Sequence, residues 1–406
     1  MAVCHRPAAC RSCMAHIPCA LSPESLEYAP LVFPLCRDPP MADDPTLDAL
    51  RSAIESYVDP YLHQTLREAG ALKELSASQG GYTARIGVGY PVGGYEEELT
   101  AALTAHVAAA GLTTGPLEVQ VQSQIRPHAV QRPLQPIGQI KNIVAVASGK
   151  GGVGKSTVAV NLALAWAQQG ARVGVLDADI YGPSQPLMLG LSGEKPVSPD
   201  GKHIEPLKKH GVEAMSIGFL VDSDQPMVWR GPMVTQALSQ LLSQTRWGEL
   251  DYLVIDMPPG TGDIQLTLAQ RVPVAGAVIV TTPQDIALAD ASKGLKMFEK
   301  VSVPVLGIVE NMSVHVCSHC GHIEHIFGEG GGARMAAQYG VRLLGELPLD
   351  VRIREEADGG QPTVIAAPGS PRAKAYIEMA RHTAGALAVR PLDHGSAFPK
   401  IVVEKK

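Results

Sequence analysis

The segment from residue 149 to residue 157 constrains the fold more than any other part of this sequence. It reads Gly-Lys-Gly-Gly-Val-Gly-Lys-Ser-Thr and lies between an apolar run predicted to be a strand, residues 143–147, and a predicted helix, residues 158–169. Glycines in such a loop let backbone N–H groups turn toward phosphate oxygens at a helix N-terminus. The pattern, in this strand-to-helix context, predicts a P-loop that binds a nucleotide.

Each polar side chain of the predicted loop has an expected task. Lys155 should place its charge at the β and γ phosphates, and Ser156 should ligate Mg²⁺. The predicted nucleotide-binding residues of the loop are Gly149, Lys150, Gly151, Gly152, Val153, Gly154, Lys155, Ser156 and Thr157. The predicted ligand is ATP with Mg²⁺.

Apolar runs and helical patterns alternate after residue 139, which is typical of parallel βαβ architecture. The predicted strands are residues 143–147, 172–176, 212–217, 252–255, 277–280, 305–309 and 343–347. We therefore predict an α/β fold of the P-loop NTPase type, with a mainly parallel twisted sheet flanked by helices, over residues 140–388. Residues 389–406 are expected to be a flexible tail.

A small α+β domain is predicted before the linker, over residues 45–126. Leu47, Leu50, Ile54 and Val58 have helical spacing. Strand, helix and strand patterns follow at residues 82–88, 96–110 and 117–125. Residues 127–139 carry three prolines among polar residues and are predicted to be a linker.

Residues 1–44 hold five of the seven cysteines but show no periodic pattern. Because Met41 lies a few residues before the first predicted helix and would be a natural start, we interpret this stretch as a disordered extension or an overextended start. An alternative is a second metal site, since four thiolates can hold an iron–sulfur cluster. Its ligands would be Cys4, Cys10, Cys13 and Cys19.

Charge and hydropathy limit the partners of the chain. The formal net charge of −6 argues against a surface built to hold nucleic acid through its phosphates. No apolar run is long enough to cross a bilayer, and Arg6, Pro7 and Arg11 interrupt any signal-peptide core. We therefore predict that the protein is cytoplasmic and that it binds neither nucleic acid nor a membrane.

Lys150 gives the loop a second lysine, and with it the sequence resembles the deviant Walker A class of ATPases. The resemblance implies a homodimer in which this lysine reaches the nucleotide of the other subunit and stabilises transition-state charge. It also implies that Asp179 orients the attacking water and that Asp256 holds the Mg²⁺ shell. Each aspartate follows a predicted strand, where ligands bind in open α/β sheets. If the resemblance is set aside, the alternative interpretation is that Lys150 is a solvated loop lysine and that the two aspartates are helix-cap or turn residues.

A second group of polar residues follows the strand predicted at 305–309. Asn311 is expected to bind the adenine edge, as in related ATPases, because an amide donates and accepts at once; alternatively it ends the strand in a turn. Cys317 and Cys320 can bind one metal centre, but a closed zinc site and a four-iron cluster both take four ligands. Two subunits would supply two pairs. A zinc knuckle or inert thiols remain alternatives, since four histidines lie between residues 315 and 325.

Together these motifs resemble the Mrp/ApbC branch of iron–sulfur cluster carrier ATPases over residues 45–385. The small domain at residues 45–126 resembles the iron–sulfur assembly domain that is often fused to this branch. The resemblance implies a slow ATPase that holds a labile cluster, expected to be [4Fe-4S], between two subunits and transfers it to apo iron–sulfur proteins. Cluster assembly scaffolds are further expected partners. The alternatives are an ATP-gated electron donor and a partitioning-type positioning ATPase. The latter leaves Cys317 and Cys320 without a role.

Overall fold

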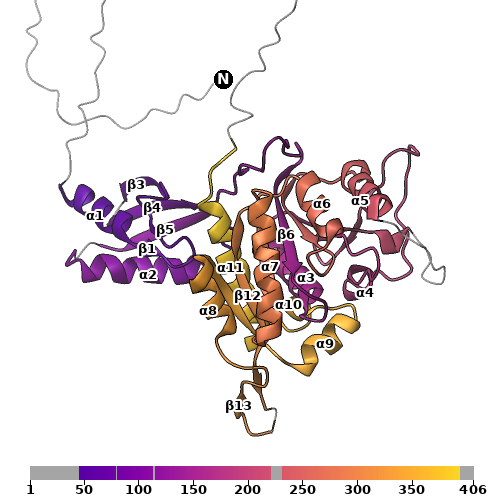
Figure 1. Ribbon diagram of the computed structural model, residues 1–406. Coiled ribbons are helices and arrows are strands. Elements are labelled where there is room, and N and C mark those ends of the chain that lie inside the picture. The colour runs from indigo at the N-terminus through magenta and orange to yellow at the C-terminus, as the bar shows by residue number, and fades with distance from the viewer. Residues whose placement is uncertain (1–44, 79, 113–114, 221–230, 318, 394–406) are drawn as a thin grey trace, which may run out of the picture. The chain divides into compact units, whose positions relative to one another are not determined.

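A nine-stranded, mainly parallel sheet organises the chain (Figure 1). In this computed structural model the described residues are 45–78, 80–112, 115–220, 231–317 and 319–393. The predictions for residues 1–44, with their five cysteines, and for residues 394–406 lie outside them. The strands are β6 (Ile140–Ser148), β7 (Val173–Asp177), β8 (Leu207–Lys209), β9 (Val212–Ser216), β10 (Leu250–Asp256), β11 (Gly276–Thr281), β12 (Val305–Val316), β13 (Ile323–Glu324) and β14 (Arg342–Pro348).

The strand order is β13-β12-β11-β6-β10-β7-β9-β8, and β14 also pairs with β12. All neighbours run parallel except the outer pairs β12–β13 and β8–β9. The four strands β6, β7, β10 and β11 are almost continuously buried because helices cover both faces. This arrangement confirms the predicted α/β P-loop fold.

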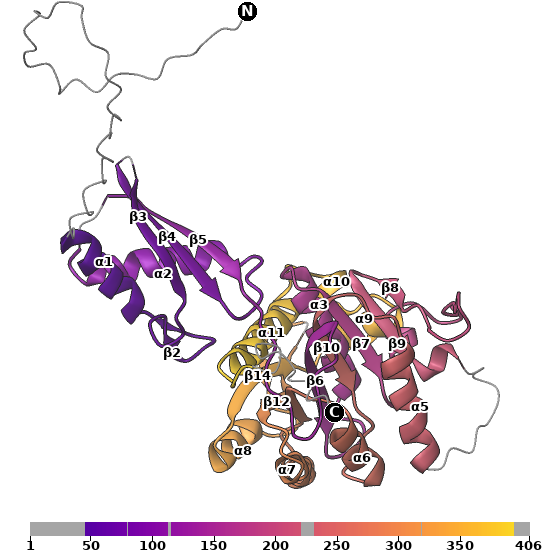
Figure 2. The same cartoon turned by 90° about the horizontal axis from the view of Figure 1, so that it is seen from above.

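Helices form a layer on each side of the sheet (Figure 2). One layer contains α3 (Lys155–Gln168), α10 (Thr363–Ala366) and α11 (Pro371–Ala388), and the other contains α6 (Asp263–Arg271), α7 (Asp285–Lys300) and α8 (Gly331–Tyr339). The others are α4 (Gln185–Met188), α5 (Gly231–Gln244), α9 (Val351–Asp358) and a 3₁₀ turn (Ile217–Phe219). Among the described residues, no helix is long and apolar enough to span a membrane.

The N-terminal module contains a three-stranded sheet in the order β3-β4-β5. Its elements are α1 (Pro45–Ser56), β1 (Val58–Asp59), β2 (Gln64–Thr65), β3 (Leu72–Ser78), β4 (Gly81–Val88), α2 (Glu96–Ala109) and β5 (Leu117–Ser123). The helical spacing of Val58 was misleading: the helix ends at Ser56, and Val58 lies on β1 with 57% of its surface exposed. The cause is the Asp59-Pro60 pair, since a residue before proline favours an extended backbone.

Asp59 fixes the turn that follows it. Its buried carboxylate accepts hydrogen bonds from the backbone N–H groups of Tyr61 (2.9 Å) and Leu62 (2.8 Å) and from the Tyr90 hydroxyl (2.6 Å). The turn carbonyls of Tyr61 and Leu62 accept in turn from the guanidinium of Arg342 on β14, each at 2.8 Å. The turn is thus a contact point between the N-terminal module and the large sheet.

Helix α11 completes this contact. Arg381 is buried, and its guanidinium lies 4.8 Å from the centroid of the Tyr95 ring, within cation–π range. Gly385 passes so close to the Tyr61 carbonyl that a Cβ atom there would collide with backbone.

Residues 127–139, which were predicted to be a linker, make contacts with the large sheet domain. They include Gln131, whose buried side-chain amide donates to the backbone carbonyls of Ala269 and Val272.

Replacing Gly385 with alanine should therefore destabilise the protein, although alanine normally favours a helix interior by up to about 1 kcal/mol. We expect a loss of about 1–3 kcal/mol in the free energy of unfolding, since the new methyl group must displace the Tyr61 backbone. Gly294→Ala in α7 is the matched control, because its nearest neighbours stand at ordinary contact distance, 3.9 Å or more. Urea denaturation measures the free energy of unfolding of both variants. An equal loss of stability in the two variants would contradict the steric argument.

Candidate nucleotide site and cysteine hairpin

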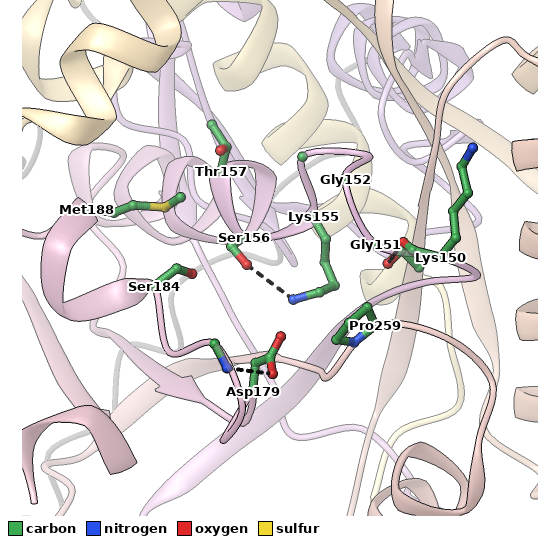
Figure 3. A pocket seen from close by; sticks show the side chains of 13 residues that line it. Lys150, Gly151, Gly152, Lys155, Ser156, Thr157, Asp179, Ser184, Met188 and Pro259 are labelled. Carbon is green, nitrogen blue, oxygen red and sulfur yellow. Dashed lines mark hydrogen bonds between the residues drawn. The ribbon is translucent and has the colours of Figure 1, made fainter. Parts of the chain in front are cut away.

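The predicted P-loop joins β6 to α3 and curls around an open cavity of about 250 Å³ (Figure 3). Gly154 has φ +80°, in the left-handed region that favours glycine, and precedes the first helical residue. Helix α3 thus directs its N-terminus at the cavity. The cavity is lined by Ser148, Lys150, Gly151, Gly152, Gly154, Lys155, Ser156, Thr157, Asp179, Gly182, Ser184, Met188 and Pro259.

Lys155 forms a buried ion pair at the base of this cavity. Its ammonium donates to Oδ1 of Asp256, the last residue of β10, and to the Ser156 hydroxyl at 3.2 Å. Lys155 is 6% exposed and Asp256 is fully buried. Each charge therefore depends on the other, because an unpaired charge at this depth would cost several kcal/mol.

Gln185 is the third member of this group. Its side-chain amide donates to Oδ2 of Asp256 at 2.9 Å and to the Ser156 carbonyl at 3.2 Å. Gln185 is the first residue of α4, so one side chain links the P-loop, the end of β10 and the segment after β7. The motif pattern did not predict it, because a glutamine at a helix start carries no signal of its own.

Asp177 shapes the loop that follows β7. Its buried carboxylate accepts from the backbone N–H groups of Asp179 (3.1 Å), Ser184 (3.0 Å) and Gln185 (3.1 Å). Burial, and secondly the neighbouring charge of Asp256, raise the pKa of Asp177 to about 7. The sequence motif assigned a task to Asp179 and none to Asp177; the role of Asp177 as the anchor of this loop is visible only in the structure.

Asp179 lies on the same loop and reaches the cavity wall. Its Oδ1 accepts from the Gly182 N–H at 3.3 Å, and burial raises the pKa of its carboxyl group. Nearby, the Ser184 hydroxyl lines the cavity, and its buried oxygen has no hydrogen-bond partner among the described residues. The loop thus presents one acidic and one unsatisfied hydroxyl oxygen where phosphates would lie.

The structure brings four predicted site residues together: Lys155, Ser156, Asp179 and Asp256. Lys150 differs, because its side chain points away from the Lys155 ammonium (Figure 3). Its backbone carbonyl accepts from the Ser148 hydroxyl at 2.8 Å, which fixes the start of the loop. Within one chain, therefore, the two lysines of the loop do not converge.

Asn311 lies on β12 and contacts the P-loop itself. Its amide donates to the Val153 carbonyl at 2.9 Å, and the residue is 5% exposed. The predicted strand at 305–309 is longer in the structure and continues past Asn311 to Val316. The residue predicted to bind adenine is thus part of the strand that leads to the cysteines.

The cysteine pair lies on a short hairpin between β12 and β13. His315 pairs with Glu324 and Val316 with Ile323, and the Cys317 N–H donates to the His322 carbonyl at 2.9 Å. Cys317 is half-buried and Cys320 exposed, and both thiols are free. Hydrogen bonds from the backbone at His319 and Cys320 lower the pKa of Cys317, which favours its thiolate.

The surrounding histidines do not complete a metal site with these thiols. Nδ1 of His315 lies 3.0 Å from the Leu349 carbonyl, and Nδ1 of His325 lies 3.1 Å from the Ser313 carbonyl. Within the described ranges, no three His, Cys, Asp or Glu side chains are grouped to hold a metal ion. The described part of one chain therefore offers a metal centre only the two thiols of Cys317 and Cys320.

Comparison with known proteins gives a consistent set of relatives. A family described as ParA, NUBPL iron-transfer P-loop NTPase, matches residues 139–384. An iron-sulfur cluster carrier protein of Haemophilus influenzae is 51% identical over 360 residues, 88% of this chain and 95% of its own length. That of Pseudomonas fragi is 64% identical over 264 residues, 65% of this chain and 92% of its own length.

Two more relatives extend this comparison. The mouse iron-sulfur cluster transfer protein NUBPL is 53% identical over 259 residues, 63% of this chain and 81% of its own length. Among solved structures, a nucleotide-binding protein from Archaeoglobus fulgidus in complex with ADP is 40% identical, with a TM-score of 0.51. It covers 58% of this chain and 91% of its own.

The raised pKa of Asp177 predicts how its contribution to stability varies with pH. Unfolded, an aspartate titrates near pH 3.9, so between about pH 4 and about pH 7 the folded protein holds a proton that the unfolded chain has lost. The contribution of Asp177 is thus present at the acidic end and declines as pH rises through this window. We therefore expect the difference in unfolding free energy between the wild type and Asp177→Asn, measured by urea denaturation at a series of pH values, to decrease as pH rises from about 4 to about 7. A difference that does not change with pH would contradict the assignment.

Proposed function

This chain belongs to the family of NUBPL-type iron-transfer P-loop NTPases, and we propose that it carries an iron–sulfur cluster as cargo and delivers it to apo-proteins under the control of ATP. Membership confirms the resemblance to the Mrp/ApbC carriers. One observation carries the proposal: strand β12 bears Asn311 against the P-loop, and Cys317, the first residue of the cysteine pair, directly follows the end of the same strand at Val316. A single strand thus joins nucleotide site and cargo site.

The cargo would be held between two copies of the chain. A four-iron cluster takes four cysteines, and each chain contributes Cys317 and Cys320, so a homodimer supplies the set. Three exposed apolar side chains on the hairpin support an interface there, since such groups gain from being covered. They are Val316, Ile323 and Ile326, each more than half exposed. We propose a [4Fe-4S] cluster on the two-fold axis.

Phosphate binding would rearrange the ion pair at the base of the cavity. An arriving phosphate competes with Asp256 for the ammonium of Lys155, and the Asp256 carboxylate then becomes available on the side of the Ser156 hydroxyl. A hard cation prefers such oxygens, so Ser156 and Asp256 fit a Mg²⁺ shell. When bound, Mg²⁺ would neutralise phosphate charge.

Hydrolysis would require the remaining two charged residues. Asp179 lies on the cavity wall, where its carboxylate can orient a water molecule, and its raised pKa makes it a better proton acceptor. The Lys150 side chain points away from the Lys155 ammonium, and we propose that it reaches the nucleotide of a second subunit. Slow turnover follows, because the charge that stabilises the transition state must come from a partner.

The cargo site is tested by anaerobic reconstitution with iron and sulfide. Wild type should gain about four irons per dimer, whereas Cys317→Ala/Cys320→Ala should gain none. The chain offers a matched control in Cys10 and Cys13, which have the same two-residue spacing. Their double alanine variant should bind like wild type. Full binding by the Cys317/Cys320 variant, measured by iron content and absorbance, would refute the proposed site.

The nucleotide site is tested by replacing each of the two loop lysines, Lys155 and Lys150, in a separate variant. Lys155→Ala should abolish ATP binding and ATP-dependent cluster transfer, because the phosphates lose their main cation. Lys150→Ala should retain ATP binding but lose on the order of 10³-fold in hydrolysis rate, as when an arginine finger is removed. Titration with a fluorescent ATP analogue and a phosphate-release assay measure both. Transfer by Lys155→Ala at the wild-type rate would exclude coupling between ATP and cargo.

A further inference from the structure

Glu310 is a buried acid that neither the nucleotide site nor the cysteine pair explains. It lies on β12 directly before Asn311, is 1% exposed, and has no ion-pair partner among the described residues. Its Oε2 accepts a hydrogen bond from the backbone N–H of Gly332, while its buried Oε1 has no partner there. Burying a carboxyl oxygen without a partner costs free energy, so packing alone gives no reason for an acid at this position.

The acceptor atom holds the start of α8. Gly332 is the second residue of that helix, whose first N–H groups have no acceptor inside the helix. A Cβ atom at Gly332 would lie 2.9 Å from Cβ of Glu310, so glycine is what allows the strand and the helix start to approach this closely. A negative group here is also favoured by the helix dipole.

Glu310 and Asn311 connect the strand to different structures. Successive side chains on a strand point to opposite faces, and here one reaches α8 while the other donates to the Val153 carbonyl of the P-loop. Only one peptide unit separates the two contacts. A displacement of the P-loop that pulls on Asn311 would therefore also act on the bond between Glu310 and Gly332.

The cysteine hairpin lies between these two anchored points. The chain leaves Glu310 along β12, forms the hairpin with Cys317 and Cys320, and returns at Gly332. Nδ1 of His325 lies 3.1 Å from the Ser313 carbonyl, so the returning arm contacts the strand again. The bond between Glu310 and Gly332 thus closes the base of the loop that carries both thiols.

We propose that Glu310 is a positioning residue that transmits the state of the P-loop to the cysteine hairpin by holding α8 to β12. This inference rests on the proposed function, because it names the contact through which nucleotide would act on the cargo thiols. It assigns Glu310 no contact with nucleotide or cluster. Removing its carboxyl group should leave both binding sites present and remove the communication between them.

The test measures how fast iodoacetamide alkylates Cys317 and Cys320 in the full chain, with and without Mg·ATP. The five cysteines before residue 41 are changed to serine, so that only this pair reacts. We expect ATP to slow alkylation about fivefold or more in this parent protein. In Glu310→Ala the rates with and without ATP should agree within about twofold, while the affinity for ATP stays near that of the parent.

Two variants distinguish positioning from a loss of structure. Glu310→Gln should restore the ATP effect, because its side-chain carbonyl can still accept from the Gly332 N–H. Glu346 lies opposite Glu310 in the register of β12 and β14, and its side chain is exposed. Glu346→Ala therefore removes a neighbouring acid without touching the contact to Gly332 and should leave the ATP effect unchanged. If Glu310→Ala fails to fold, Gly332→Ala separates strand and helix start from the other side and should reduce the effect as well.

The outcomes separate this inference from the proposed function. If ATP changes alkylation equally in the parent and in Glu310→Ala, Glu310 does not transmit the signal, and the carrier proposal is untouched. If ATP leaves the parent unchanged although it binds, the hairpin does not sense nucleotide, and the ATP control in the proposed function fails together with this inference. Loss of the effect in Glu310→Ala and its recovery in Glu310→Gln support the assignment.

Discussion

Lys155 and Asp256 face each other where the P-loop helix begins and β10 ends, and the rest of the nucleotide site is arranged around this buried pair. Neither charge is tolerable alone at this depth, so each fixes the position of the other. Gln185 adds a neutral contact to the same carboxylate and extends the group to α4. A phosphate that takes the ammonium would therefore be sensed at once by both neighbouring segments.

The topology of the sheet explains why these segments meet. Strands β6, β7, β10 and β12 are parallel members of one sheet and point toward the same edge, and the first three end there in residues of the site. The P-loop follows β6, Asp177 ends β7 and Asp256 ends β10. Strand β12 is the exception, since it runs past the common edge and carries the chain outward to the cysteines.

Sequence patterns predicted the parts of the fold in which local signals agree with the final packing. All seven strands predicted after residue 139 exist, because continuous apolar runs are typical of strands covered on both faces. The spacing of Val58 failed because periodicity ignores the backbone preference imposed by Pro60. Short β8 and β13 were missed, since two or three residues give no measurable period.

The residues of the candidate site also fall into two groups, those that a sequence motif predicts and those that it does not. Lys155, Ser156, Asp179 and Asp256 could be predicted because their motifs require particular residue types at fixed spacing. Gln185 and Glu310 could not, since each acts through backbone or carboxylate partners more than 20 residues away that only folding brings near. Residues of this kind have no motif, and their tasks become visible only as contacts.

The cysteine hairpin stands apart from this tightly held group in the way a releasable cargo requires. Its thiols lie beyond the sheet edge, Cys320 is exposed, and a few backbone hydrogen bonds hold the loop in place of a packed core. The same backbone groups lower the pKa of Cys317 and favour its thiolate, the form that the proposed cargo site requires. A centre held by so few contacts is sensitive to small shifts at the base of the hairpin, and that base is where β12 meets the P-loop and α8.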